Sequence, residues 1–322
     1  MSFKRFDKED IVVSSDSISS PAWSNNLVTL PQNGLTTNTD QVNSNSGNYY
    51  HNVYSTGSSG EIQFSVAYGH RYGSGSLLFN SAVTSKSYSK AVYGQFRTLL
   101  NGDEDTDFQF GTSTPNNVYF ISVERARFKE KILPGSLTLD IGTSVGNRIL
   151  LTDNSLTASV DTFKDGGREY LIYSGSQGTV NNTSTVYGKL YPDVGVIVLN
   201  GDQLASDGRI TSPTETSNYS GTNITLLVDN IRSFTLRAEE TISSNYVFVR
   251  ARNSEFNYST NPSNITGSGE LQHSTMIDTP QAYVTAVGLY NDNNDLLAVS
   301  KLSKPLLKDF TKEALIRIKL DY

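Results

Sequence analysis

The C-terminal end of the chain has the clearest pattern of apolar and polar runs. Residues 283–290 are rich in β-branched and aromatic side chains, and the run stops at the polar stretch 291–295. Short Asn and Asp side chains bond to the nearby backbone and tolerate a positive φ, which favours a turn. The return run 296–302 stops before Pro305, which cannot donate to a strand ladder. We therefore predict a hairpin here, followed by a last strand over 314–320.

The last run has one apolar face. Ile316, Ile318 and Leu320 alternate with Arg317 and Lys319. Successive side chains of a strand point to opposite sides, so this spacing predicts a strand that is buried on one side only.

Short runs of the same kind recur along the chain between turn residues. The strongest hairpin signal is Asp165-Gly166-Gly167, because Asp-Gly and Gly-Gly supply the positive φ values that tight hairpin turns need. Residues 234–241 fit a helix and a strand equally. The other predicted strands are 61–68, 118–123, 149–151, 157–160, 169–173, 186–190, 194–199, 224–228 and 246–251.

One segment, 87–100, has helical spacing. Its apolar residues Ala91, Val92, Phe96, Leu99 and Leu100 lie three to four positions apart. Ser87 can cap the start, and Asn101-Gly102 supplies a stop. We expect this helix to cover a sheet face, and the alternative is a helix that binds a partner.

Residues 1–60 differ from the rest because they are mostly polar and turn-forming from Ser14 onward, with isolated apolar residues such as Trp23. Such a stretch cannot bury enough apolar surface to fold alone. We interpret residues 1–60 as an extended arm that laces subunits together or as a loosely packed tail, and 61–322 as the body.

The composition fits a mainly β fold of short antiparallel strands with one packed helix, long polar loops and an extended N-terminal arm. Hydrophobic residues make up 36%, and Ser, Thr, Asn and Gly are plentiful. The net charge of −6 argues against nucleic acid as a partner, and no apolar run approaches the roughly 20 residues that span a bilayer. Basic residues at the N-terminus are not followed by an apolar run, so we expect no signal peptide.

Candidate metal chemistry is weak. The chain has no Cys, and its three His residues have no pairwise metal spacing, so we predict neither a metal nor a cofactor. Asp103, Asp105 and Asp107 share the spacing of the first calcium ligands of an EF-hand loop, but the turn Gly and the distant Glu are missing. A solvated acidic turn is the preferred interpretation.

Enzyme chemistry has no clear motif either. Arg125 and Arg127 suit an anion clamp, but no phosphate cradle or paired acid accompanies them, so an exposed strand face or subunit contact is preferred. No nucleophile elbow is present, whereas a pair of glycosidase carboxylates can be neither found nor excluded among 32 acidic residues. We predict that the protein is not an enzyme.

The C-terminal segment resembles a known phage pattern. Residues 287–292, 295–299 and Lys304-Pro305 with the closing strand resemble the attachment region of phage tail-collar and tail-fibre proteins. Residues 125–131, 191–199 and 250–259 extend a second likeness to most of the chain beyond about residue 60. This second likeness is to virion structural proteins of T-even-like cyanophages, which have contractile tails.

The resemblance implies a non-enzymatic structural protein of a virion that assembles in the host cytoplasm, most simply in the baseplate or at the tail-fibre attachment point. It also implies other tail proteins as partners and a homo-oligomer in a symmetric assembly. The alternatives are a receptor-binding module whose aromatic loops hold a host glycan, or a head decoration protein. The candidate interaction residues are Trp23, Arg125, Arg127, Phe256, Tyr258 and Tyr290.

Overall fold

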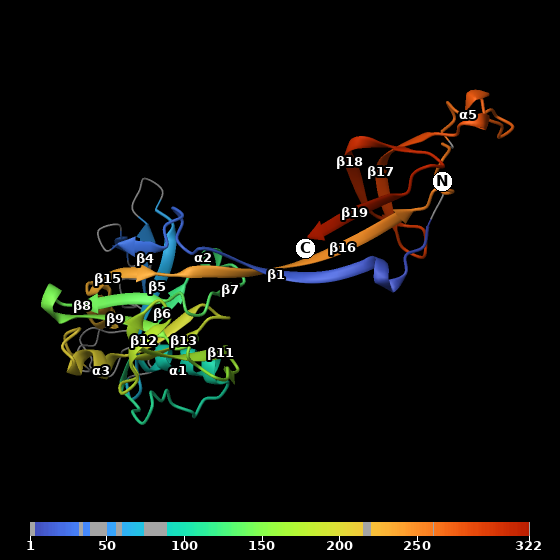
Figure 1. Ribbon diagram of the computed structural model, residues 1–322. Helices are drawn as coiled ribbons and strands as arrows, with labels where there is room; N and C mark the ends of the chain where they lie inside the picture. Colours follow the sequence, from blue (N-terminus) through green and yellow to red (C-terminus); the bar gives the residue numbers. More distant parts are fainter. Residues whose placement is uncertain are drawn as a thin grey trace. The chain divides into compact units, whose positions relative to one another are not determined.

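The computed structural model describes residues 4–31, 35–38, 50–55, 60–73, 89–214, 220–259 and 261–321 (Figure 1). The fold is mainly β, with 48% strand and 14% helix, which confirms the predicted fold class. The chain divides into two compact units. Unit 1 consists of residues 1–17 and 241–322, and unit 2 of residues 18–240. The chain passes between them within β1 (Ile11–Pro21) and β16 (Arg237–Ala251).

This division differs from the expected boundary at residue 60. Most of the described part of 18–60 belongs to the sheet of unit 2, where Leu30 pairs with Phe234 and Val53 pairs with Phe64. Leu30 and Val53 are 1% and 0% exposed. Leu30 is therefore buried in the sheet beside a strand that is distant in the sequence, and Val53 is buried beside β5.

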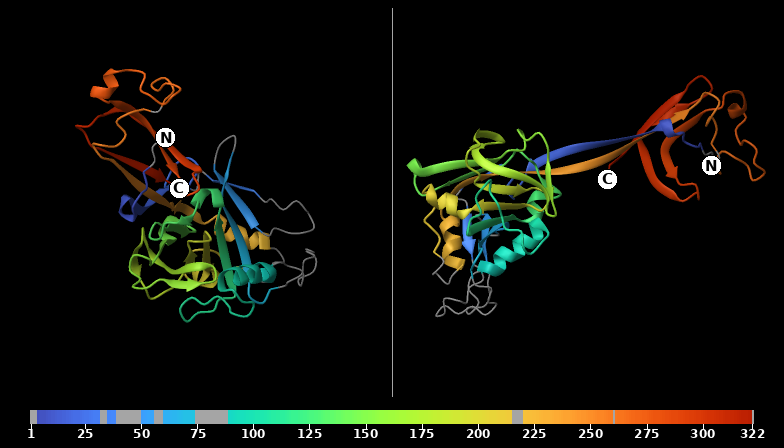
Figure 2. Two further views of the ribbon diagram at one scale, coloured as in Figure 1. Left: turned by 90° about the vertical axis from the view of Figure 1, so that its right-hand side faces the viewer. Right: turned by 90° about the horizontal axis from the view of Figure 1, so that it is seen from below.

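Unit 2 contains an antiparallel sheet of 13 strands in the described residues, and the sheet curls (Figure 2). Its strands are β2 (Thr29–Pro31), β3 (Leu35–Asn38), β4 (Tyr50–Ser55), β5 (Ile62–His70), β6 (Asn117–Val123), β8 (Thr138–Gly142), β9 (Arg148–Asp153), β10 (Thr162–Lys164), β11 (Gly167–Ser176), β12 (Thr179–Asn182), β13 (Gly188–Tyr191), β14 (Val196–Asn200) and β15 (Ile231–Thr235). The order is β2-β15-β8-β9-β11-β13-β14-β6-β5-β4-β3, and β10 and β12 also pair with β11.

Two helices cover opposite faces of the central strands of unit 2. On β6, Tyr119 and Ile121 share a buried cluster with Ile224 of α4 (Ser220–Val228). Val118 and Phe120 alternate with them and share a second cluster with residues of α1 (Ser89–Asn101). Both helices are visible in the right-hand view of Figure 2. The helix predicted over 87–100 is thus confirmed as a cover for a sheet face.

Some details of that helix differ from the prediction. Leu99 is 50% exposed, whereas Tyr93 is buried at 1% and takes its place in the apolar face. Ser87, the expected cap, lies outside the described residues.

The prediction of a strand over 224–228 is wrong, because these residues form the last turns of α4. Ile224, Leu227 and Val228 are buried at spacings of three and four, which is the period of a helix. A short apolar run fits both periods, so the sequence pattern alone could not separate them.

The remaining short elements complete the chain. Asn200 caps α3 (Gly201–Ser206), since its side-chain oxygen accepts from the N–H of Gln203 at 3.0 Å. The hairpin at Asp165-Gly166 is confirmed, because Lys164 pairs with Gly167, whose φ is +94°. The other elements are η1 (Lys8–Asp10), α2 (Arg125–Phe128), β7 (Lys131–Ile132), η3 (Val145–Asn147) and α5 (Thr275–Asp278).

Unit 1 carries the predicted C-terminal hairpin and last strand. The hairpin pairs β17 (Ala282–Tyr290) with β18 (Leu296–Lys308), and β19 (Ala314–Asp321) pairs with β16 from Ser244 to Ala251. In β19, Ile318 is buried and Arg317 and Lys319 are exposed, as predicted.

The return strand does not stop before Pro305, which corrects the prediction. The ladder shifts register between Val284 and Ala286, whose partners are Leu306 and Lys301. Pro305 falls within this irregularity, where the strand tolerates a residue that cannot donate.

The buried apolar cluster of unit 1 is small. Val247, Leu289 and Ile318 form it, with half-buried neighbours such as Val287 and Ala298. Unit 1 also buries a charged side chain, since Lys308 is 0% exposed. Its ammonium donates to the Asn257 Oδ1 at 2.7 Å and to the carbonyls of Asn253 at 3.0 Å and Asp309 at 2.9 Å.

Candidate functional site

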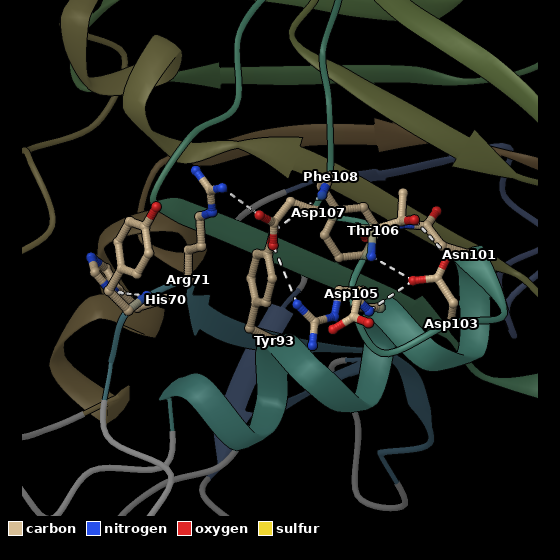
Figure 3. Close-up of polar contacts among 11 residues, drawn as sticks. His70, Arg71, Tyr93, Asn101, Asp103, Asp105, Thr106, Asp107 and Phe108 are labelled. Carbon is tan, nitrogen blue, oxygen red and sulfur yellow. Dashed lines mark hydrogen bonds and ion pairs between the residues drawn. The ribbon is translucent and has the colours of Figure 1, made fainter.

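A charged cluster in unit 2 is centred on Asp107, which follows α1 (Figure 3). Arg71, just after β5, places its Nη2 2.5 Å from the Asp107 Oδ2. Arg97 of α1 places its Nη1 3.3 Å from the Asp107 Oδ1. Both carboxylate oxygens are thus paired with guanidinium groups, which joins the end of β5 to α1.

Tyr93 completes this cluster from the helix. Its hydroxyl donates to the Asp107 Oδ1 at 3.2 Å and accepts the N–H of Phe108 at 3.1 Å. Burial raises the pKa of Tyr93 to about 12, and nearby Asp107 adds to this increase, while the Phe108 N–H opposes it. The phenol therefore stays neutral at ordinary pH, and its hydrogen bonds link α1 to the side chain of Asp107 and the backbone of Phe108.

The acidic turn beside this cluster binds its own backbone. The Asp103 Oδ1 accepts from the N–H of Asp105 at 2.8 Å, and Thr106 donates its hydroxyl to the Oδ2 at 2.5 Å. Hydrogen bonds from Thr106 and then Asp105 lower the pKa of Asp103. Asp107 is engaged with the arginines instead, and among the described residues no three His, Cys, Asp or Glu side chains are grouped to hold a metal ion.

Trp23 is part of the core of unit 2. The side chain is 2% exposed, and its Nε1 donates to the carbonyl of Phe234 at 2.9 Å. The ring lies 4.9 Å from the Phe234 ring and 6.0 Å from the Phe64 ring. Its role in this chain is packing, so it is not accessible as a contact for a partner.

Arg125 and Arg127 lie on the short helix α2 and not on an exposed strand. Arg125 is exposed, and its guanidinium lies 4.9 Å from the centre of the Phe128 ring. Arg127 pairs with Glu61 at 3.2 Å. The two side chains have different neighbours.

The three remaining candidate residues belong to unit 1. Tyr258 is 56% exposed, and Phe256 and Tyr290 are half-buried. Phe256 has a φ of 58°, an unusual value for a bulky residue. Tyr290 lies at the turn end of the hairpin, next to several exposed apolar residues that the sequence patterns did not single out: Leu296, Leu297 and Val299.

Two of the three His residues lie on strands and are buried. His51 on β4 and His70 at the end of β5 are 6% and 4% exposed, whereas His273 is exposed. Within the part of the chain that the structure describes, neither ring nitrogen of His51 has a hydrogen-bond partner. Desolvation lowers the pKa of His51, and the charge of Asp229 partly opposes this effect.

The sequence patterns also missed the Asp107 cluster. Tyr93 and Arg97 are four positions apart on one helix, which places them on one face, and this was the only local signal. Arg71 comes from a different element, so its pairing has no local signature.

Comparisons with known proteins give no identification, since no family model, no curated protein and no solved structure matches this chain. No helix among the described residues is long and apolar enough to cross a membrane.

Proposed function

We propose that this protein is a non-enzymatic structural component of a contractile-tailed phage virion, in the baseplate or at the tail-fibre attachment point. Its partners there are other tail proteins and further copies of itself. The observation that carries the proposal is the C-terminal hairpin, which bears the phage resemblance and also exposes much of its apolar surface.

Exposure on this hairpin is extensive. Tyr283, Leu297 and Val299 are 66%, 67% and 63% exposed although they lie on regular strands. Contiguous exposed apolar residues mark sites of interaction with other proteins. Strand edges can in addition pair with strands of a neighbour.

The size of the unit 1 core supports the same proposal. Only three apolar residues form its buried cluster among the described residues, in a unit of about a hundred residues. A domain of that length relies on its buried apolar area for stability, so a small core favours stabilisation by partners.

Purification of particles tests the proposal. In lysates of the phage that encodes this chain, mass spectrometry of gradient-purified particles should find the chain at a constant ratio to other tail proteins. Detection only in the particle-free fractions would overturn the proposal.

Amine labelling tests the role of unit 1 in the particle. Lys301 and Lys304 are exposed in the hairpin, and Lys164 is exposed on the β10–β11 hairpin of unit 2. We expect an acetylating reagent to modify Lys301 and Lys304 in the purified protein but less in particles, with Lys164 as the control. Equal labelling of all three in both samples would contradict assembly through unit 1.

A further inference from the structure

The β17–β18 hairpin has two faces of different character. On one face, Val287, Leu289 and Ala298 pack into the small core of unit 1. Side chains alternate along a strand, so Gly288, Tyr290 and Val299 lie on the other face. Leu297 is two residues from Val299 and so shares its face, and Leu296 joins them because the ladder shifts register between Leu289 and Tyr290 and pairs Leu296 with Tyr290. We call the apolar part of this second face the outer patch, and it consists of Tyr290, Leu296, Leu297 and Val299.

Gly288 shapes the outer patch. A Cβ atom added to Gly288 would lie 2.9 Å from the Tyr290 ring and 3.2 Å from the Leu296 Cδ1. The side chains of Tyr290 and Leu296 therefore lie close to the backbone of Gly288. Gly288 pairs with Val299 on the neighbouring strand. The result is a low apolar surface without a side chain at position 288, onto which another flat surface can pack closely.

The outer patch remains open in the single chain. Leu296, Leu297 and Val299 are 53%, 67% and 63% exposed. By contrast, the inner neighbour Leu289 is 8% exposed. The apolar side chains of this hairpin thus lie on two faces, one buried in the core of unit 1 and one exposed.

Charges at the two ends of the outer patch indicate what covers it. Asp292 and Asp295 lie at the turn, and Lys301 and Lys304 lie toward the other end of the hairpin, all of them exposed. Val299 is near the middle, four residues from Asp295 and five from Lys304. A hairpin with acids at one end and lysines at the other is complementary to a copy of itself turned end to end.

The net charge of unit 1 permits such self-association. Unit 1 contains 11 Lys and Arg and 12 Asp and Glu residues, a net charge of −1, whereas unit 2 contains 15 and 20, a net charge of −5. Two copies of unit 1 therefore approach one another with little long-range repulsion.

We propose that the outer patch packs against the outer patch of a second copy of this chain, with the two hairpins antiparallel about a two-fold axis near Val299. In this arrangement the acidic turn of each copy faces the lysines of the other. The inference rests on the proposed assembly role and adds the surface and the partner.

The size of the patch sets the expected strength. The nine residues of β17 make the hairpin about 30 Å long, and with its side chains it offers roughly 500 Å² per copy, or about 1,000 Å² in total. This area is at the low end for specific interfaces, so we expect a dissociation constant on the order of 10 μM for two free copies. Repetition within a symmetric assembly then strengthens the contact.

Sedimentation velocity of the full chain between about 1 and 200 μM tests the inference. We expect a shift from monomer to dimer, and Val299→Lys should raise the dissociation constant at least about tenfold. The matched control is Val160→Lys in unit 2, where Val160 is 78% exposed, and it should leave the dissociation constant unchanged. A wild-type chain that stays monomeric, or a Val299→Lys chain that associates like wild type, would overturn the proposal.

Charge reversal tests the antiparallel geometry with variants at exposed positions. Asp292→Lys alone and Lys304→Asp alone each place two like-charge pairs in the dimer, so each should associate about tenfold more weakly than wild type. An equimolar mixture of the two variants restores opposite charges at both ends and should associate like wild type. A mixture that associates no better than the separate variants would exclude this geometry.

These results are separable from those for the proposed function. If the chain is found in particles but the purified protein stays monomeric, the virion role stands and the outer patch is rejected. If the purified chain dimerises through the patch but is absent from particles, the surface stands and the virion role is rejected.

Discussion

Unit 2 and unit 1 differ in how completely they bury the apolar side chains of their strands. In unit 2, neighbouring residues of a central strand such as Tyr119 and Phe120 are both 0% exposed, because each face of the sheet has its own cover. In unit 1, the buried apolar cluster of the strands β16, β17 and β19 consists of Val247, Leu289 and Ile318 among the described residues. The difference indicates that unit 2 is stabilised by a large core of its own, whereas the core of unit 1 is small.

The location of exposed apolar residues repeats this contrast. In unit 2, the most exposed apolar residues, Val145 and Val160 at 88% and 78%, lie in a short 3-10 helix and a connection, and Phe163 at 68% lies on the three-residue strand β10. In unit 1, Leu297, Val299 and Leu315 are at least 63% exposed and lie on paired strands. Isolated apolar residues in connections are normal on protein surfaces, whereas apolar sheet faces are typical of interfaces.

The largest expected effect comes from the aromatic centre of unit 2. Phe64 is 0% exposed and contacts the rings of Trp23 and Phe234. Phe64→Ala should lower the free energy of unfolding of unit 2 by about 3–5 kcal/mol, because it leaves a cavity in a packed core. Urea unfolding followed by the fluorescence of Trp23, the single Trp, measures this change.

The control for this experiment is Phe163→Ala, since Phe163 is 68% exposed and should change stability by less than about 0.5 kcal/mol. A separate unfolding transition of unit 1, followed by calorimetry, should be unaffected by Phe64→Ala. Equal shifts of both transitions would show that the two units unfold together and would contradict the view that their stabilities are separate.

The charged cluster at α1 should give a smaller effect. Asp107→Asn leaves Arg71 and Arg97 without their carboxylate, and we expect a loss of about 1–2 kcal/mol in the stability of unit 2, reduced by partial exposure. Thermal unfolding measures it, with Asp105→Asn, an exposed neighbour, as the control. A calcium-dependent melting temperature of the wild type, lost in Asp107→Asn, would instead revive the metal interpretation.

The smallest effect concerns acidification. The pKa of His51 is lowered from 6.5 in the folded chain, so the unfolded chain binds this proton more readily. Stability is therefore present in full above about pH 6.5 and falls below it, by at most about 1.4 kcal/mol per pH unit. Urea unfolding between pH 7.5 and 5.5 should show this decrease.

His51→Phe should remove the decrease over this range, whereas His273→Gln, at an exposed position, should retain it. Carboxyl groups ordinarily titrate below this pH range, so they contribute little to the decrease. The same pH dependence in His51→Phe and wild type would contradict the assignment to His51.

The features that the sequence predicted are those with local causes. The turn at 291–295 depends on Asn291, whose side-chain oxygen accepts the N–H of Asp295 at 2.7 Å, and Asn294 has the positive φ that its residue type tolerates. The Asp165-Gly166 turn and the alternation of β19 are equally local. All three could be inferred from a few neighbouring residues.

The features that the sequence did not predict depend on distant partners. Trp23 in a polar stretch gave no sign of its contact with Phe234, which is 211 positions away. Asp107 looked like part of an acidic turn because Arg71 and Arg97 belong to other elements. Exposure of the outer patch likewise could not be inferred, since Leu296, Leu297 and Val299 lie in a short apolar run of a kind that buried strands also have.

The buried Lys308 has a consequence for how unit 1 responds to its surroundings. Three oxygens of Asn253, Asn257 and Asp309 surround its ammonium, much as oxygens surround a bound sodium or potassium ion. A free ion bound at this position would dissociate when the medium is diluted. The exposed ion pair of Arg250 and Glu313 responds in the opposite way, because added salt screens and weakens it. The ammonium is covalently attached, so the loop beginning at Asn253 keeps its anchor in media of low and high salinity alike.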